Sequence, residues 1–291
     1  MPSDTIHSAR RVIAQHPAKR DDIGDLVTRR PLPGPGLDQL DPFLFLNHHG
    51  PQTYPANNHG LPFGPHPHRG FETVTFILEG SLAHADSAKH QSVINAGGVQ
   101  WMTAGSGIVH AEISPPEFLR DGGPLEILQL WVNLPSRLKM IEPRYVGLQQ
   151  ESIPAIKLPG GGELNLISGE WQGNAGPIDT LTGVFMSTLR LPAGSHEQLP
   201  VASGRQVFLY VVDGDVTVGG EPVKAHHLIE VDRDGESLDI EASSNARLLF
   251  GHGEVIDEPV YSHGPFVMTT REEIVQAVED YQNGKFGGLD A

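Results

Sequence analysis

Short apolar or alternating runs, separated by turn residues, recur along most of the chain. The clearest lies at residues 71–78 and is closed by Glu79-Gly80, a signal for a hairpin turn. The other runs lie at residues 41–46, 99–103, 125–134, 181–191, 206–212, 215–218, 227–231 and 247–250. Many short strands with frequent turns predict an all-β protein.

One segment near the C-terminus has the pattern of a helix instead. Thr270 and Glu273 have the spacing of a capping box, which satisfies free backbone N–H groups at a helix start. Gly284 is a typical residue just beyond a helix end. The apolar stripe between these signals comprises Ile274, Val275, Val278 and Tyr281. We therefore expect one short C-terminal helix.

The chain divides into two halves of similar pattern. Residues 135–165 are rich in proline and glycine, and they predict a connection between two domains. The first domain would comprise residues 1–134, and the second residues 166–291, with the helix at its end. Residues 76–80 resemble residues 210–214, and a hairpin strand follows each of them. This internal repeat predicts two similar β-barrels.

Composition narrows the location and the partners of the protein. The formal net charge of −16 argues against direct binding to nucleic acid or to anionic membranes. The absence of cysteine excludes disulfides, thiolate metal sites and cysteine nucleophiles. The polar N-terminal segment has no apolar signal region, and no run approaches the ~20 apolar residues of a membrane span. These features predict a cytoplasmic protein without membrane association.

Two pairs of metal-binding residue types stand out in the first half. His66 and His68 are two residues apart, as are His110 and Glu112. Residues i and i+2 of a β-strand point to the same face, so each pair would project together. If the two strands are neighbours with those faces inward, three imidazoles and one carboxylate converge on one point. The sequence therefore predicts a metal site formed by His66, His68, His110 and Glu112.

The second half lacks this constellation. Aligning the repeated turns sets His66 against Pro200, His68 against Ala202, His110 against Leu238 and Glu112 against Ile240. None of these replacements is a metal ligand, and apolar Leu238 and Ile240 would fill the barrel. The His252-Gly253-Glu254 segment repeats the His-x-Glu spacing, but it follows the aligned ligand position. We expect a second barrel without a metal.

Several other polar residues near the predicted site have simpler interpretations. Counting back along residues 71–78 places Glu72 on the face of His66 and His68, where it could accept a hydrogen bond from a ligand imidazole. His48 and His49 are expected in a loop, with a smaller chance of lining the mouth of the site. The remaining hairpin histidines, His84, His90, His226 and His227, are expected to be exposed.

A set of motifs is spread over almost the whole chain. The central motif is His66-Pro67-His68-Arg69-Gly70-Phe71-Glu72-Thr73. The other motifs are residues 41–43, 100–105, 107–112, 130–134, 264–268 and 281–288. Together they resemble the pirin family of the cupin superfamily. The resemblance implies a bicupin of two jelly-roll β-barrels. It also implies a metal, usually iron, in the N-terminal barrel only. The ligands would be His66, His68, His110 and Glu112, the same residues that the strand pattern predicts.

The resemblance and the ligand set together predict an activity. Three imidazoles and one carboxylate suit Fe(II), and also Mn, Ni, Cu or Zn. The resemblance implies Fe(II) among these. Six-coordinate Fe(II) would keep two positions for small molecules. Some pirins oxidise the flavonol quercetin with O2, which implies an Fe(II)-dependent, quercetin 2,3-dioxygenase-like oxidoreductase. Glu112 would be both a ligand and the catalytic base for the substrate hydroxyl.

Two alternative functions follow from the same residues. The first is a metal- or redox-responsive protein-interaction regulator without catalysis, because other pirins act through protein partners and the second barrel lacks ligands. The second is a metal-dependent isomerase or hydrolase, since the cupin fold accommodates many chemistries.

Overall fold

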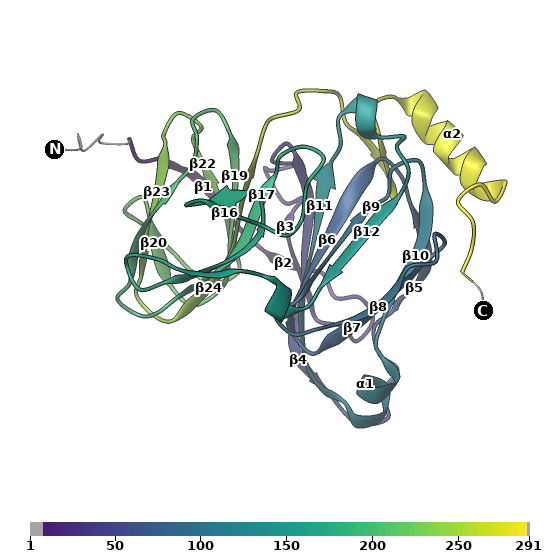
Figure 1. The fold of residues 1–291 in the computed structure, drawn as a ribbon, viewed down its shortest axis with the longest axis horizontal. Coiled ribbons are helices and arrows are strands. Elements are labelled where there is room, and N and C mark those ends of the chain that lie inside the picture. The colour runs from purple at the N-terminus through teal and green to yellow at the C-terminus, as the bar shows by residue number, and fades with distance from the viewer. Residues whose placement is uncertain (1–7, 290–291) are drawn as a thin grey trace. The chain divides into compact units, whose positions relative to one another are not determined.

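The computed structural model describes residues 8–289, whose regular secondary structure is almost entirely β-strand (Figure 1). The described residues contain the α-helices α1 (Pro116–Asp121) and α2 (Arg271–Gln282) and the 3-10 turns Ser136–Leu138 and Gln150–Ser152. The all-β prediction is confirmed. Among these residues no helix is long and apolar enough to cross a bilayer. The cytoplasmic location stays a prediction.

The described chain forms two compact units, each assembled from separate segments. The first barrel comprises residues 20–30, 43–152 and 256–289. The second barrel comprises residues 8–19, 31–42 and 153–255. These units differ from the predicted contiguous ranges 1–134 and 166–291, of which residues 1–7 and 290–291 lie outside the described part.

The first barrel is built on two antiparallel sheets. The larger has the strand order β12-β9-β6-β11-β4-β3-β2, and the smaller the order β5-β10-β7-β8. The strands of the larger sheet are β2 (Lys19–Arg20), β3 (Thr28–Leu32), β4 (Phe43–Tyr54), β6 (Phe71–Glu79), β9 (Val99–Thr103), β11 (Gly123–Asn133) and β12 (Arg144–Leu148). Those of the smaller sheet are β5 (Phe63–His68), β7 (Ser81–Asp86), β8 (Gln91–Asn95) and β10 (Ile108–Ile113).

The second barrel repeats this plan, with sheet orders β1-β22-β19-β24-β17-β14-β13 and β18-β23-β20-β21. The larger sheet contains β1 (Val12–Pro17), β13 (Ala155–Lys157), β14 (Glu163–Ser168), β17 (Phe185–Leu191), β19 (Gln206–Asp213), β22 (His227–Val231) and β24 (Ala246–Gly253). The smaller contains β18 (His196–Pro200), β20 (Val216–Val218), β21 (Glu221–Val223) and β23 (Ser237–Ala242). Two further hairpins are β15 (Glu170–Trp171) with β16 (Asn174–Ala175), and β25 (Tyr261–His263) with β26 (Phe266–Met268).

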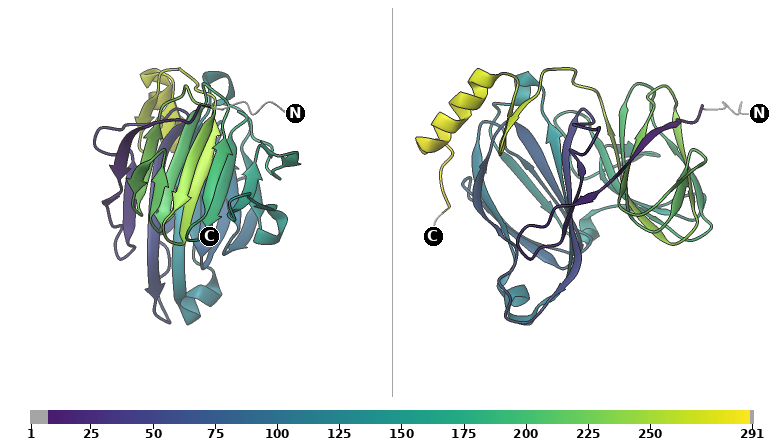
Figure 2. Two further views of the ribbon diagram at one scale, coloured as in Figure 1. Left: turned by 90° about the vertical axis from the view of Figure 1, so that its left-hand side faces the viewer. Right: turned by 180° about the vertical axis from the view of Figure 1, so that it is seen from behind.

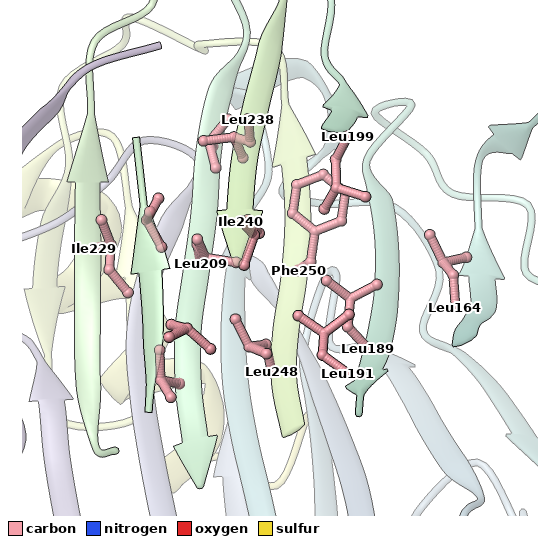
Figure 3. Close-up of a cluster of buried hydrophobic side chains, with 14 of the residues drawn as sticks. Leu164, Leu189, Leu191, Leu199, Leu209, Ile229, Leu238, Ile240, Leu248 and Phe250 are labelled. Carbon is pink, nitrogen blue, oxygen red and sulfur yellow. The ribbon is translucent and has the colours of Figure 1, made fainter. Parts of the chain in front are cut away.

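The interior of the second barrel is filled with aliphatic side chains and phenylalanine (Figure 3). Leu238 and Ile240, the residues aligned with His110 and Glu112, are both fully buried in this cluster. Leu199 packs in it as well, opposite Leu238 in the β18–β23 pairing. The apolar filling predicted for this barrel is therefore present.

Helix α2 packs on the first barrel, whereas the sequence predicted it at the end of the second domain. Its capping box is formed as predicted, since the Thr270 side chain accepts from the Glu273 backbone and Glu273 reaches back to the cap. Ala277 of the helix is buried in a cluster with Val109, Phe266 and Phe286. In the right-hand view of Figure 2 the yellow helix lies outside the blue strands of this barrel. These contacts join segments far apart in sequence, which local patterns do not reveal.

The prediction that Glu72 of β6 lies on the same face as His66 and His68 is wrong. The Thr75 hydroxyl, not Glu72, points at β10, where it donates to Glu112 Oε1 at 2.9 Å. Glu72 lies on the opposite face and accepts from Thr103 Oγ1 at 2.6 Å. The alternation of side-chain directions does not continue from β6 back to β5, because Gly70 interrupts it. Gly70 has a φ of +88° and separates two strands that belong to different sheets. A side chain there would also meet the Val267 carbonyl at 2.0 Å.

Candidate metal centre

Three histidines from two neighbouring strands converge inside the first barrel. β5 and β10 are antiparallel, with His66 opposite His110 and His68 opposite Ile108. One ring nitrogen from each histidine lies within 4.8 Å of those of the other two. The ring centroids are 4.8 Å apart for His66 and His68, 4.4 Å for His66 and His110, and 4.9 Å for His68 and His110. This spacing allows one ion to contact all three.

The hydrogen bonding of the three rings suits a metal ion. His66 Nδ1 lies 2.7 Å from the Gly64 carbonyl and His68 Nδ1 lies 3.4 Å from the Pro265 carbonyl, so both can donate there. Within residues 8–289, His68 Nε2 and both nitrogens of His110 are buried without a hydrogen-bond partner. Buried polar atoms are seldom left unpaired, so these nitrogens mark a place for a bound group.

Burial keeps the two inner imidazoles neutral, as metal ligands must be. Burial, together with the neighbouring His66, lowers the pKa of His68 to about 3. The pKa of His110 is lowered well below its ordinary value by burial and by His68 and His66. Neutral rings present free lone pairs to a cation. The donor set therefore fits a divalent transition metal.

Glu112, the fourth predicted ligand, is buried on β10 but does not belong to the cluster of three histidines found among the described residues. A β-bulge separates it from His110 in the pairing with β5. Its Oε1 accepts from Thr75 and Gln100, and its Oε2 accepts from Gln129. These donors all come from the larger sheet, so the carboxylate spans the interior. The four-ligand set stays a prediction.

The two glutamines provide a test of whether Glu112 supports the centre. Replacing Gln129 with leucine removes the donor to Oε2 and frees the carboxylate to rotate. We expect metal affinity to fall about 10- to 100-fold, the usual cost of losing a group that orients a ligand. The metal affinity is measured by letting the metal-free protein compete for the ion with a chromophoric chelator. Gln206→Leu in the second barrel is the control, and an affinity equal to that of the control would contradict the expectation.

His84 is a residue of this site that sequence reasoning missed. It was predicted to be exposed, yet it is only 3% exposed. On β7 it lies opposite Glu112, while Asp86 lies opposite His110. The alternation of Leu82, His84 and Asp86 directly after the Gly80 turn is an inward-facing pattern that could have identified it.

A polar network surrounds His84. Its Nε2 lies 3.0 Å from Asp86 Oδ2, and its ring stacks on Tyr145 with centroids 4.0 Å apart. His90, more exposed, also bonds the Asp86 carboxylate. Burial raises the pKa of Asp86, but hydrogen bonds from His84 and His90 outweigh it and hold the pKa below its usual value. Asp86 is therefore an anion between the two histidines.

The other candidate histidines do not join the cluster of three found in the described part of the chain. His48 and His49 lie in strand β4 and are buried, so their placement in a loop is wrong. His48 Nε2 lies 3.0 Å from Glu126, and His49 Nδ1 lies 2.9 Å from the Thr28 hydroxyl. In the second barrel, Arg205 Nε donates to His252 Nδ1 at 2.7 Å.

Comparisons with known proteins point to one family. The sequence pattern of Pirin matches residues 25–132, and that of the Pirin C-terminal cupin domain matches residues 186–287. A pirin-like protein of Caulobacter vibrioides is 42% identical over 268 residues, 91% of this chain and 94% of that protein. A solved quercetin 2,3-dioxygenase from Acinetobacter baumannii has a TM-score of 0.91 and 33% identity over 97% of this chain and 100% of its own.

A second solved structure is similar in fold. It is a bacterial pirin from Escherichia coli in complex with nickel(II), with a TM-score of 0.66 and 22% identity over 83% of this chain and 98% of that chain.

Proposed function

This chain belongs to the pirin family, and on that premise we propose that it is an Fe(II)-dependent dioxygenase of quercetin-like flavonols. The convergence of His66, His68 and His110 inside one barrel carries the proposal. The name of the A. baumannii relative, which aligns over nearly the whole of both chains, supports the choice of substrate. O2 is the co-substrate of such a reaction.

The three histidines would hold the ion, with Glu112 as the fourth ligand. When bound, Fe(II) would supply open coordination positions and one-electron chemistry with O2. Neutral nitrogen donors also accept Mn, Ni, Cu or Zn, and the E. coli pirin was solved with nickel(II).

Aromatic side chains next to the histidines form a wall suited to a flat substrate. Trp131 stacks with Phe45 at a centroid distance of 4.6 Å and lies 4.4 Å from Phe71. Its ring is also 5.5 Å from that of His68. Such a wall binds aromatic rings through their faces and excludes water from the reacting atoms.

Glu112 is the proposed base. A carboxylate can take the proton of a flavonol hydroxyl, and the enolate that results is more electron-rich and reacts more readily with O2. Thr75, Gln100 and Gln129 hold this carboxylate in one orientation without occupying all of its lone pairs.

Loading the metal-free protein with Fe(II) under nitrogen, then adding quercetin and air, tests the proposal. We expect the uptake of one O2 for each quercetin consumed, together with loss of the flavonol absorbance band. Glu112→Gln should lower kcat about 100-fold or more, because proton transfer typically contributes 10²–10⁴-fold. No O2 uptake above that of the metal-free protein, with Fe, Mn, Ni, Cu or Zn, would refute the activity.

A metal- or redox-responsive interaction role is the alternative function. The apolar interior of the second barrel favours it, because Leu238 and Ile240 stand there in place of His110 and Glu112 and offer no ligand atoms to a metal. Pull-downs from the same extract with metal-loaded and metal-stripped protein distinguish the two functions. Identical partners in both states would remove the regulatory role.

A further inference from the structure

His84 carries a buried polar atom that neither the metal centre nor the proposed base uses. Each of His66, His68 and His110 offers one ring nitrogen to the cluster that can hold an ion. His84 Nδ1 is outside that cluster, yet it too is buried and lacks a hydrogen-bond partner among residues 8–289. A buried acceptor without a donor marks a place where a ligand can supply one.

Strand register places this nitrogen beside the site. His84 lies directly opposite Glu112 in the β7–β10 pairing, and paired side chains on one face are ~5 Å apart at Cβ. Its ring centroid is 5.5 Å from that of His110. Both strands, β7 and β10, are labelled in the first barrel in Figure 1. A substrate held next to His110 and Glu112 would therefore also adjoin His84.

Asp86 determines which nitrogen of His84 carries the hydrogen. Asp86 Oδ2 is an acceptor 3.0 Å from His84 Nε2, so the hydrogen lies on Nε2. With its one hydrogen on Nε2, the ring offers Nδ1 as a lone pair. The stack on Tyr145, at an interplanar angle of 10°, prevents the ring from turning away. The acceptor is thus fixed in both chemistry and direction.

We propose that His84 Nδ1 anchors the substrate by accepting a hydrogen bond from one of its hydroxyl groups, with Asp86 as the positioning residue. This inference rests on the proposed function, and it names the polar feature by which the site recognises its substrate. It favours aromatic substrates with two neighbouring oxygens: one hydroxyl for His84 and another oxygen for the side facing the three histidines. A ligand that lacks the hydroxyl would leave Nδ1 unpaired.

Anaerobic titration of the Zn-loaded protein with two ligands tests the anchor without turnover. The ligands are quercetin and the flavone that differs only by lacking its 3-hydroxyl. His84→Phe keeps the stack on Tyr145 but removes both nitrogens. We expect it to weaken quercetin binding about 10-fold and to change binding of the flavone less than about 2-fold. Equal losses for the two ligands, or no loss, would overturn the proposal.

Asp86→Asn tests the same anchor if the phenylalanine variant does not fold. The His90 backbone N–H donates to Asp86 Oδ1 at 3.0 Å, so the oxygen of an asparagine would stay there. Its amide group would then face His84 Nε2 and donate to it, which moves the ring hydrogen to Nδ1. The selective loss for quercetin should recur, while metal content stays that of wild type. His227→Phe in the second barrel is the matched control.

Failure of the anchor and failure of the flavonol proposal give different results. If the wild-type protein binds neither flavonoid, quercetin is not its substrate, and catechol and its monomethyl ether become the probes. The same selective loss of catechol binding in His84→Phe then supports the anchor. The proposal is overturned if wild type and variant bind catechol and its monomethyl ether with the same affinities, or if neither protein binds them.

Discussion

Replacing His110 with alanine is expected to reduce bound metal from about one ion per chain to less than about a tenth of that after dialysis. His110 is fully buried beside the other two histidines, and both of its ring nitrogens lack a hydrogen-bond partner within the described residues. Its removal leaves two imidazoles, one of which, His66, is partly exposed. Elemental analysis of protein loaded with Fe(II) under nitrogen measures the loss.

The fold should survive this substitution, because the first barrel has an apolar cluster that includes Ile77, Leu125 and Ile127 and does not include the histidines. Circular dichroism of the variant should match that of the metal-free wild type. His49→Ala is the control matched for burial, since His49 bonds Thr28 rather than the cluster. Full metal content in His110→Ala, or equal loss in His49→Ala, would contradict the ligand assignment.

Replacing Arg69 with methionine is expected to destabilise the first barrel by about 3 kcal/mol, the low end for breaking a buried ion pair. Arg69 is 4% exposed, and its guanidinium lies 2.8 Å from Asp280 Oδ2 and 4.5 Å from the centre of the Phe286 ring. Hydrogen bonds from Lys285 and Arg69 lower the pKa of Asp280 to about 2, so it is ionised at neutral pH. The variant would leave this carboxylate with Lys285 and Gln276 as its remaining partners.

Urea unfolding followed by tryptophan fluorescence measures the change. Arg120→Met is the control, because its pair with Asp121 is exposed and exposed ion pairs contribute little to stability. Adding Asp280→Asn to Arg69→Met should recover part of the loss, because it removes the carboxylate charge that Arg69 no longer balances. Equal destabilisation by Arg69→Met and Arg120→Met would show that the contact does not secure helix α2.

The histidine cluster could be predicted from the sequence because it depends only on local geometry and one strand pairing. His66 with His68, and His110 with Glu112, each obey the two-residue period of a strand. β5 and β10 are paired, and this pairing brings the three histidines together. The capping box of α2 was predictable for the same reason, since Thr270 and Glu273 are three residues apart.

Features that depend on long-range packing could not be predicted in this way. The parity count through Gly70 failed because the chain passes from one sheet to the other there. His84 was missed because its burial follows from the pairing of β7 with β10. The placement of α2 depends on Arg69 and Asp280, which are 211 residues apart. No local pattern of apolar and polar residues records such a contact.

The most direct test of the central claim is anomalous diffraction from a crystal of the Fe(II)-loaded protein, recorded on both sides of the iron absorption edge. One anomalous peak is expected at ~2.0–2.2 Å from a ring nitrogen of each of His66, His68 and His110, with a Glu112 oxygen at a similar distance. An ion at any other position, or no ion between these three rings, would contradict the account of the metal centre.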